Sequence, residues 1–154
     1  MFTKVLIANR GEIAVRIIQT LRRLGVKSVA VYSDADRHSL AVQLADEAVA
    51  LGGNSPAESY LRGDLILAAA KATGAEAVIP GYGFLSENAG FAEQCAAAGI
   101  VFVGPTPTQL RQFGLKHEAR ALAQAAQVPL TPGSGLLDSV AHALSDAERV
   151  GYPL

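Results

Sequence analysis

The chain has 154 residues, half of them hydrophobic, and carries 13 lysines and arginines against 14 aspartates and glutamates. This length suits one compact domain with a hydrophobic core and part of a second element. Because the charges nearly balance, the chain lacks the basic field on which nucleic-acid binding depends, and that class of function is disfavoured.

The N-terminus and the single cysteine exclude further classes. The apolar run from Val5 to Ala8 is far too short for a signal peptide or a membrane span, so we expect a cytoplasmic protein with no membrane partner. Cys95 has no second thiol for an internal disulfide and no second ligand at metal-site spacing. We expect it to be a buried spectator, because free cysteines are commonly buried.

The first hundred residues alternate between strand-like and helix-like patterns. Residues 4–9 form a short apolar run, and residues 11–25 follow with apolar side chains at every third or fourth position up to a closing glycine. Such alternation is typical of a parallel sheet covered on both faces, so the fold class is α/β, a Rossmann-like doubly wound parallel sheet. Further strands are expected at 27–33, 47–51, 75–80 and 100–104, and further helices at 39–46, 61–74 and 87–99.

The pattern changes after Gly104. Helices are expected at 105–114, 115–127 and 138–151, and Pro153 lies where a new strand would begin. We therefore expect residues 1–104 to be one domain. Residues 105–154 would be linker helices and the start of a second domain, in a chain that is a fragment of a longer protein.

The turn after the first strand bears on nucleotide binding. Gly11 leads into a helix whose free amides favour an anion. A dinucleotide fingerprint needs two further glycines, and Glu12 and Ala14 do not supply them, so nicotinamide binding is disfavoured. Asp34 and Asp36 follow the second strand, where a ribose-binding acid would lie, but paired acids in a polar turn are more often helix caps.

The loop IPGYGFLSEN, residues 79–88, is the most distinctive stretch of the chain. It follows the fourth strand, at the edge of the sheet where open α/β folds bind ligands. Gly81 and Gly83 permit backbone angles or a close approach that a side chain would block. Tyr82 and Phe84 can then wall a site, although a tight turn with buried rings is an equal alternative.

Three other features are weaker. Ser86 is placed to cap the helix after the loop. Lys116, between two helices, can reach a nucleotide phosphate as a point charge, although lysines in such turns are usually solvated. The three histidines are widely scattered, and no serine, histidine and acid set is evident. The residues alone therefore predict no catalytic group and no metal site.

Six segments occur along the chain in a characteristic order: KVLIANRGEIAVRII, VAVYSDADRHSLAVQLADEAV, SYL, PGYGFLSEN, FVGPTP and GLKHEARALA. Together they resemble the N-terminal domain of biotin carboxylases over nearly the whole chain. Such enzymes use ATP and bicarbonate to carboxylate biotin held on a biotin carboxyl carrier domain. Their fold is a Rossmann-like pre-ATP-grasp domain, an ATP-grasp domain and a C-terminal domain. The resemblance implies that this chain is the first of these with linker helices, truncated before the ATP-grasp domain.

The resemblance also implies roles for particular residues. The family lysine that matches Lys116 contacts an ATP phosphate, and the loop that matches Tyr82, Gly83 and Phe84 lines the biotin site. The glycines would let the flat ureido ring approach the backbone, and the aromatic rings would wall it. The family's phosphate loop, magnesium ligands and bicarbonate-binding residues lie beyond Leu154. No catalytic residue is therefore expected in this chain, and it should not be active alone.

The sequence departs from the family pattern at three places, which bear on the subfamily and on the oligomeric state. Leu115 stands where acetyl-CoA, propionyl-CoA and pyruvate enzymes commonly have aspartate, and residues 113–137 look more like urea carboxylases. Ile79 replaces a usual histidine. Gln19 and Arg23 stand where many bacterial relatives carry a basic and an acidic residue at a dimer contact, so the oligomeric state stays open.

We therefore expect the N-terminal part of a urea carboxylase, with a carboxyltransferase domain as a further partner. The alternatives are an acetyl-CoA, propionyl-CoA or pyruvate carboxylase, another ATP-grasp ligase such as a carbamoyl-phosphate or purine-pathway enzyme, and a non-catalytic interaction module. The PGYGFLSEN loop separates biotin carboxylases from other ATP-grasp ligases. An intact phosphate loop and magnesium ligands in the following sequence would separate an enzyme from an interaction module.

Overall fold

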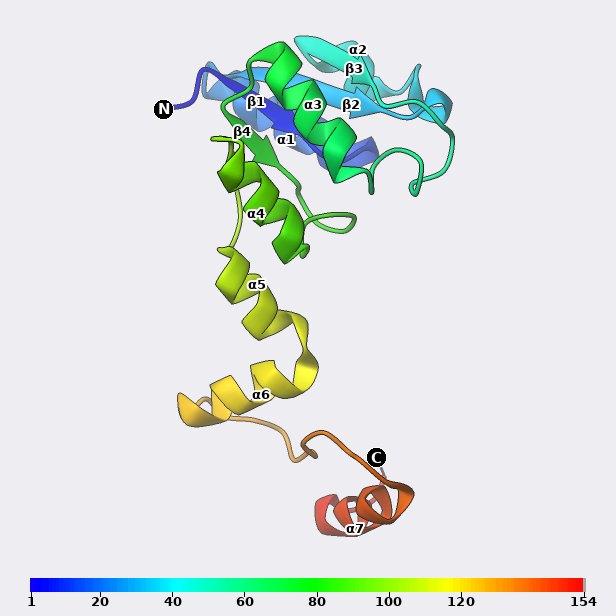
Figure 1. The fold of residues 1–154 in the computed structure, drawn as a ribbon, viewed down its shortest axis with the longest axis vertical. Helices are drawn as coiled ribbons and strands as arrows, with labels where there is room; N and C mark the ends of the chain where they lie inside the picture. The colour runs from blue at the N-terminus through cyan, green and yellow to red at the C-terminus, as the bar shows by residue number, and fades with distance from the viewer. Residues whose placement is uncertain (154) are drawn as a thin grey trace. The chain divides into compact units, whose positions relative to one another are not determined.

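The computed structural model describes residues 1–153, and the chain divides into two compact units, Met1–Pro107 and Thr108–Leu154. Each unit is described by itself. The first unit alternates strands and helices around one sheet (Figure 1). Its elements are β1 (Lys4–Ile7), α1 (Gly11–Arg23), β2 (Lys27–Tyr32), a 3₁₀ turn (Asp34–Asp36), α2 (Leu40–Leu44), β3 (Glu47–Ala50), α3 (Gly63–Thr73), β4 (Ala77–Ile79), α4 (Ala89–Ala97) and β5 (Val101–Phe102).

The sheet has five strands in the order β3-β2-β1-β4-β5, and every neighbouring pair is parallel. This confirms the predicted doubly wound parallel sheet. From β1 the chain builds β2 and β3 on one side and then crosses to β4 and β5 on the other. The order thus reverses between β1 and β4, where Leu6 lies opposite Val78. In such sheets the carboxyl ends of the two strands at this switch point border a crevice.

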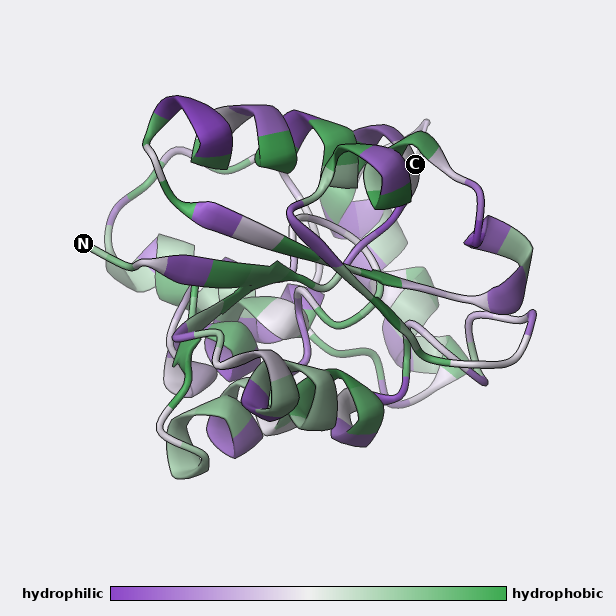
Figure 2. Cartoon of the chain, turned by 90° about the horizontal axis from the view of Figure 1, so that it is seen from above, coloured by the Kyte–Doolittle hydropathy of each residue, from purple (hydrophilic) through white to green (hydrophobic). Residues whose placement is uncertain are grey.

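The sheet is buried on both faces, as the continuous apolar runs predict. Leu6 and Val78 belong to a core shared with α3 and α4, whereas Val5 and Ile7 point into a second core shared with α1 and α2. Cys95 on α4 is fully buried in the first core, which confirms its predicted position, and this burial raises the pKa of its thiol to about 11. Figure 2 shows the apolar strands between the two helical layers.

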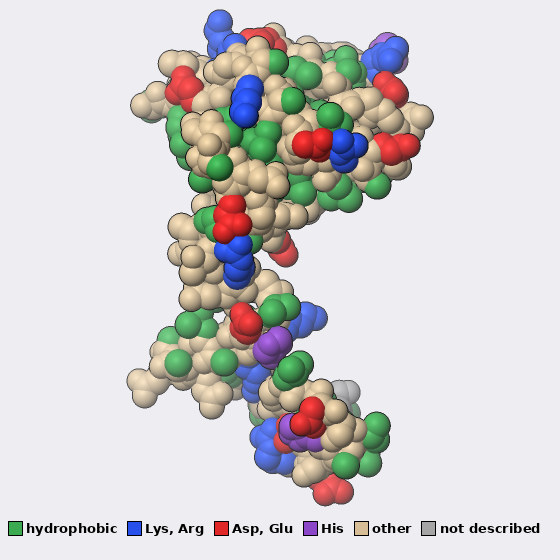
Figure 3. Space-filling view, viewed as in Figure 1, with side chains coloured by type: hydrophobic (Ala, Val, Ile, Leu, Met, Phe, Trp, Pro, Cys, Tyr) green, Lys and Arg blue, Asp and Glu red, His purple; other side chains and the backbone are tan. Residues whose placement is uncertain are grey.

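Charged groups lie outside these cores. On the face drawn in Figure 3, the acidic and basic side chains of the first unit are scattered singly or in pairs. Lys4 and Glu47, for example, form an ion pair with 2.6 Å between nitrogen and oxygen. Within residues 1–153, no helix is both long and apolar enough to cross a bilayer.

The start of α4 differs from the prediction. The helix begins at Ala89, and its cap is Asn88, whose side-chain oxygen accepts a hydrogen bond from the Phe91 amide at 2.9 Å. Ser86, the predicted cap, lies too early because residues 83–86 close their own turn, in which the Ser86 amide donates to the Gly83 carbonyl at 2.9 Å. The side chain that satisfies a free helix amide is therefore that of Asn88.

This assignment predicts unequal effects on stability. We expect Asn88→Ala to lower the free energy of unfolding of the chain by about 1 kcal/mol, because a free amide of the first helical turn loses its acceptor. Ser86→Ala is the matched control and should change it by less than about 0.5 kcal/mol. Urea denaturation of both variants measures the difference. A larger loss for Ser86→Ala would contradict the assignment.

The second unit is helical. It contains α5 (Pro107–Gly114), which begins at the boundary, α6 (Lys116–Ala125) and α7 (Val140–Val150). A non-helical connector of residues 126–139 joins α6 to α7. Ser139 caps α7 by accepting a hydrogen bond from the His142 amide at 3.1 Å. The three consecutive helices predicted after the sheet are therefore present.

Candidate functional site

A cleft of about 420 Å³ lies where the loops after β1 and β4 meet. Residues 9–13 and 82–84 line it, so the predicted Tyr82, Gly83 and Phe84 lie together at the edge of the sheet where its strand order reverses. Clefts of roughly 300–1,000 Å³ in such positions are the usual sites for small ligands in open α/β folds.

Asn9 anchors the β4 loop from the end of β1. The side chain is almost fully buried, and its amide nitrogen donates to the carbonyls of Pro80 at 2.7 Å and Tyr82 at 2.8 Å. Its side-chain oxygen accepts from the Arg10 amide at 2.9 Å. Both the nitrogen and the oxygen of the Asn9 amide therefore form hydrogen bonds to backbone groups. Sequence reasoning missed this residue, although a polar side chain directly after a buried strand was the available signal.

The two loop glycines do different things. Both have left-handed backbones, with φ of 66° at Gly81 and 74° at Gly83. A Cβ on Gly81 would lie 2.7 Å from a methyl carbon of Ile13 on α1, so this glycine lets the loop pack against that helix. A Cβ on Gly83 would have no atom within 4 Å, so its missing side chain leaves open space on the cleft.

Tyr82 ties the loop to the start of α1. Its side chain is 64% exposed, and its hydroxyl donates a hydrogen bond to the carboxylate of Glu12 in the first turn of α1. This bond raises the pKa of Tyr82, because ionisation would bring two negative groups together. Both residues line the cleft, so the hydrogen bond joins its two lining segments.

Phe84 is held in an unfavourable backbone conformation. Its φ is 44°, a region that costs a residue with a side chain about 1–2 kcal/mol. The ring stacks on the buried Tyr60, with 5.2 Å between ring centroids and 18° between ring planes. This stacking offsets part of the backbone cost and fixes where the Phe84 ring lies.

Tyr60 is itself fixed by polar partners. Its hydroxyl donates to Asp36 at 2.7 Å and accepts from the Ser33 amide at 3.1 Å. Burial and the hydrogen bond to Asp36 raise the pKa of Tyr60 to about 12. Partial burial acts to raise the pKa of Asp36, but hydrogen bonds from Tyr60 and Ser33 and the charge of Arg10 outweigh it and lower that pKa. Asp36 therefore stabilises the position of Tyr60. Neither Asp34 nor Asp36 lines the cleft.

Lys116, the predicted phosphate contact, is the first residue of α6 in the second unit. Its side chain is exposed and makes no hydrogen bond or ion pair with the residues that the structure describes. A cation at the positive end of a helix is unfavourably placed unless an anion lies nearby. Glu118 supplies an acidic side chain in the same turn, so the geometry leaves Lys116 exposed without assigning it a ligand.

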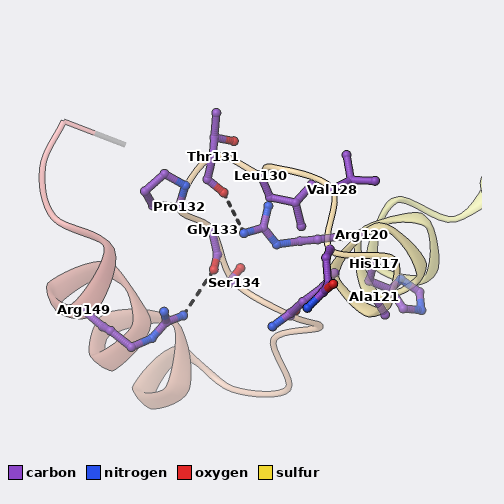
Figure 4. Close-up of a pocket in the computed structure, with 13 residues that line it drawn as sticks. His117, Arg120, Ala121, Val128, Leu130, Thr131, Pro132, Gly133, Ser134 and Arg149 are labelled. Carbon is purple, nitrogen blue, oxygen red and sulfur yellow. Dashed lines mark hydrogen bonds between the residues drawn. The ribbon is translucent and has the colours of Figure 1, made fainter.

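A second hollow, of about 590 Å³, lies within the second unit (Figure 4). Arg120 of α6 donates to the Thr131 carbonyl at 2.8 Å, and Arg149 of α7 donates to the Gly133 carbonyl at 3.3 Å. Both guanidinium groups thus bind the connector between the two helices. Lys116 does not line this hollow, but its neighbour His117 does.

Metal ligands are not gathered in the described part of the chain. Among residues 1–153, no three histidine, cysteine, aspartate or glutamate side chains lie close enough together to hold a metal ion.

Comparison with known proteins decides the family. The model of the biotin carboxylase N-terminal domain matches residues 1–110. The chain belongs to this family. It is 58% identical over 153 residues to a urea amidolyase of Lachancea kluyveri, with 99% of the chain and 8% of that protein aligned. The chain thus spans about a twelfth of that relative's length, and the first unit contains most of the matched domain.

Solved structures of biotin carboxylase relatives share the fold. The K. lactis urea amidolyase is 61% identical with a TM-score of 0.84, over 85% of this chain and 8% of that one. The biotin carboxylase domain dimer of Hydrogenobacter thermophilus 2-oxoglutarate carboxylase is 43% identical with a TM-score of 0.93, over 99% of this chain and 34% of that one. The latter was solved with MgADP, ADP and bicarbonate.

Proposed function

We propose that this chain is the N-terminal part of a biotin carboxylase that uses ATP and bicarbonate to carboxylate biotin within a urea carboxylase. The observation that carries the proposal is the cleft between the β1 and β4 loops, where a family-matched glycine and two aromatic residues lie together. The chain matches the biotin carboxylase N-terminal domain, and the resemblance to that family implies that the loop of Tyr82, Gly83 and Phe84 lines a biotin site.

The cleft's residues fit the ureido ring system of biotin. Gly83 leaves open space into which no side chain projects, and a flat ring can approach the backbone there. Phe84 and Ile13 offer apolar surface for the sulfur-containing part of the bicycle. The role that we assign to these residues is to bind and orient biotin, while bound ATP supplies the phosphoryl group that activates bicarbonate.

Lys116 is the proposed ATP contact of the chain. Its ammonium group carries three donors and has no partner among the described residues, and the start of α6 adds a positive field. A phosphate oxygen would satisfy both. We propose that magnesium ligands and bicarbonate-binding residues come from sequence beyond Leu154, in the ATP-grasp domain that residues 105–154 would begin after a first domain of residues 1–104.

The proposed acceptor is urea. In support, the chain is 58% identical to a urea amidolyase and 49–52% identical to biotin, methylcrotonoyl-CoA and propionyl-CoA carboxylases. Leu115 beside Lys116 agrees with the urea carboxylase pattern. We propose a biotin carboxyl carrier domain and a carboxyltransferase domain as partners in a cytoplasmic enzyme, with the latter domain selecting the acceptor.

The biotin assignment predicts the effect of removing the Phe84 ring. In the full-length enzyme, Phe84→Ala should raise the KM for biotin by about tenfold or more, because the cleft loses an aromatic wall. The KM for ATP should stay unchanged. Phe2→Ala, which removes an N-terminal ring that does not line the cleft, is the matched control. Biotin-dependent ATP hydrolysis gives both constants, and an unchanged biotin KM in Phe84→Ala would refute the assignment.

A further inference from the structure

Arg10 links the cleft to the cluster that supports Phe84. It lies between the buried Asn9 and the first residue of α1, and it lines the cleft. Its guanidinium carbon lies 5.7 Å from the centroid of the Tyr60 ring and 5.8 Å from that of the Phe84 ring. Since the two rings are 5.2 Å apart, the three groups are almost equally spaced, and one cation contacts both aromatic systems.

The same guanidinium is oriented by a carboxylate. One terminal nitrogen of Arg10 lies 3.5 Å from the oxygen of Asp36 that accepts the Tyr60 hydroxyl. Asp36 therefore aligns the arginine and the tyrosine through one atom. The Arg10 side chain is about half exposed, so burial in the core does not explain its position.

Phe84 depends on this support. Its left-handed backbone follows a left-handed Gly83, so the local chain does not favour the observed conformation. Asn9 holds the backbone of the loop only as far as Tyr82. Beyond that point, the contacts that fix Phe84 include the stacking on Tyr60 and the guanidinium of Arg10.

We propose that Arg10 is a positioning residue that holds the Phe84 ring in place and thereby sets the form of the biotin cleft. The part of this inference that concerns biotin rests on the proposed function. Arginine suits the task because its planar, delocalised cation stacks on aromatic rings and pairs with a carboxylate at its edge. Lysine would keep the charge near Asp36 but would lose the flat surface.

The test compares Arg10→Met with Arg10→Lys in the full-length enzyme. Arg10→Met should raise the KM for biotin about fivefold, with kcat and the KM for ATP almost unchanged, because a cation contact to the rings is lost. Arg10→Lys should recover part of this change. Arg37→Met is the matched control, because Arg37 pairs with Asp34 at 3.4 Å and does not line the cleft.

A second measurement reports on the loop without activity. Chymotrypsin cleaves after exposed aromatic residues, so Arg10→Met should speed cleavage after Tyr82 or Phe84, as located by mass spectrometry. Arg37→Met should not. Unchanged cleavage and an unchanged biotin KM in Arg10→Met would overturn the inference. So would equal rises in the KM for biotin and for ATP with a lower melting temperature, because they would indicate a general loss of folding.

These results separate the inference from the proposed function. If Phe84→Ala raises the biotin KM and Arg10→Met changes neither that KM nor the cleavage of the loop, the biotin site stands and the role of Arg10 is refuted. If Arg10→Met speeds cleavage of the loop but Phe84→Ala leaves the biotin KM unchanged, Arg10 does position Phe84 and the biotin assignment is refuted.

Discussion

Lys116→Met in the full-length enzyme should raise the KM for ATP by about tenfold to a hundredfold, because a hydrogen bond between charged groups contributes roughly 1.5–3 kcal/mol. Methionine keeps the length of the side chain and removes its charge. Lys116 has no partner in the described structure, so its loss should leave folding intact. The KM is measured in bicarbonate-dependent ATP hydrolysis, with a melting curve beside it.

Lys27→Met is the control for this substitution. Lys27 is also exposed, but it begins β2, at the amino edge of the sheet. Its replacement should leave the KM for ATP almost unchanged, because substitutions of surface residues usually change free energies by less than about 0.5 kcal/mol. An equally small effect at Lys116 would make that residue a solvated charge and remove the proposed ATP contact of this chain.

The loop glycines should differ sharply when each is replaced by alanine. In the isolated chain, Gly81→Ala should lower the free energy of unfolding by about 2–4 kcal/mol, because a left-handed backbone and a close contact with Ile13 both oppose the added methyl. Gly83→Ala meets no neighbouring atom and should cost only the backbone part, about 1–2 kcal/mol.

The effect on biotin binding should be larger at Gly83, the glycine that lines the cleft, although its effect on stability is the smaller one. In the full-length enzyme, Gly83→Ala adds a methyl group to a residue that lines the proposed biotin cleft, so it should raise the KM for biotin more than its effect on stability explains. Urea denaturation of the chain and the biotin KM of the enzyme measure the two effects. Equal losses of stability at Gly81 and Gly83 would contradict their separate roles.

The sheet could be predicted because its strands are short apolar runs between helical segments. The lengths of the strands could not be predicted, because they depend on which residues pair with a neighbouring strand. Residues 100–104 predict a longer strand, but only Val101 and Phe102 pair with β4 in the sheet. Residues 75–80 likewise begin before the strand, because the Ala75 amide closes the end of α3 by donating to the Ala70 carbonyl.

The cleft was predictable only in part. Tyr82, Gly83 and Phe84 lie in one short stretch whose glycines and rings mark it, and the structure places all three on the cleft. Arg10 and Tyr60 come from distant loops, and nothing in their local sequence indicates that both contact the Phe84 ring. Such contacts arise only when the parallel sheet brings the ends of its strands together.

The most direct test of the proposed function is the rate of bicarbonate-dependent ATP hydrolysis by the full-length enzyme with different carboxyl acceptors. We expect the enzyme to hydrolyse ATP only when bicarbonate is present. We also expect urea to accelerate this reaction, and acetyl-CoA, propionyl-CoA and pyruvate not to do so. Acceleration by one of those three and not by urea would contradict the proposed acceptor. ATP hydrolysis that does not depend on bicarbonate would contradict the carboxylase itself.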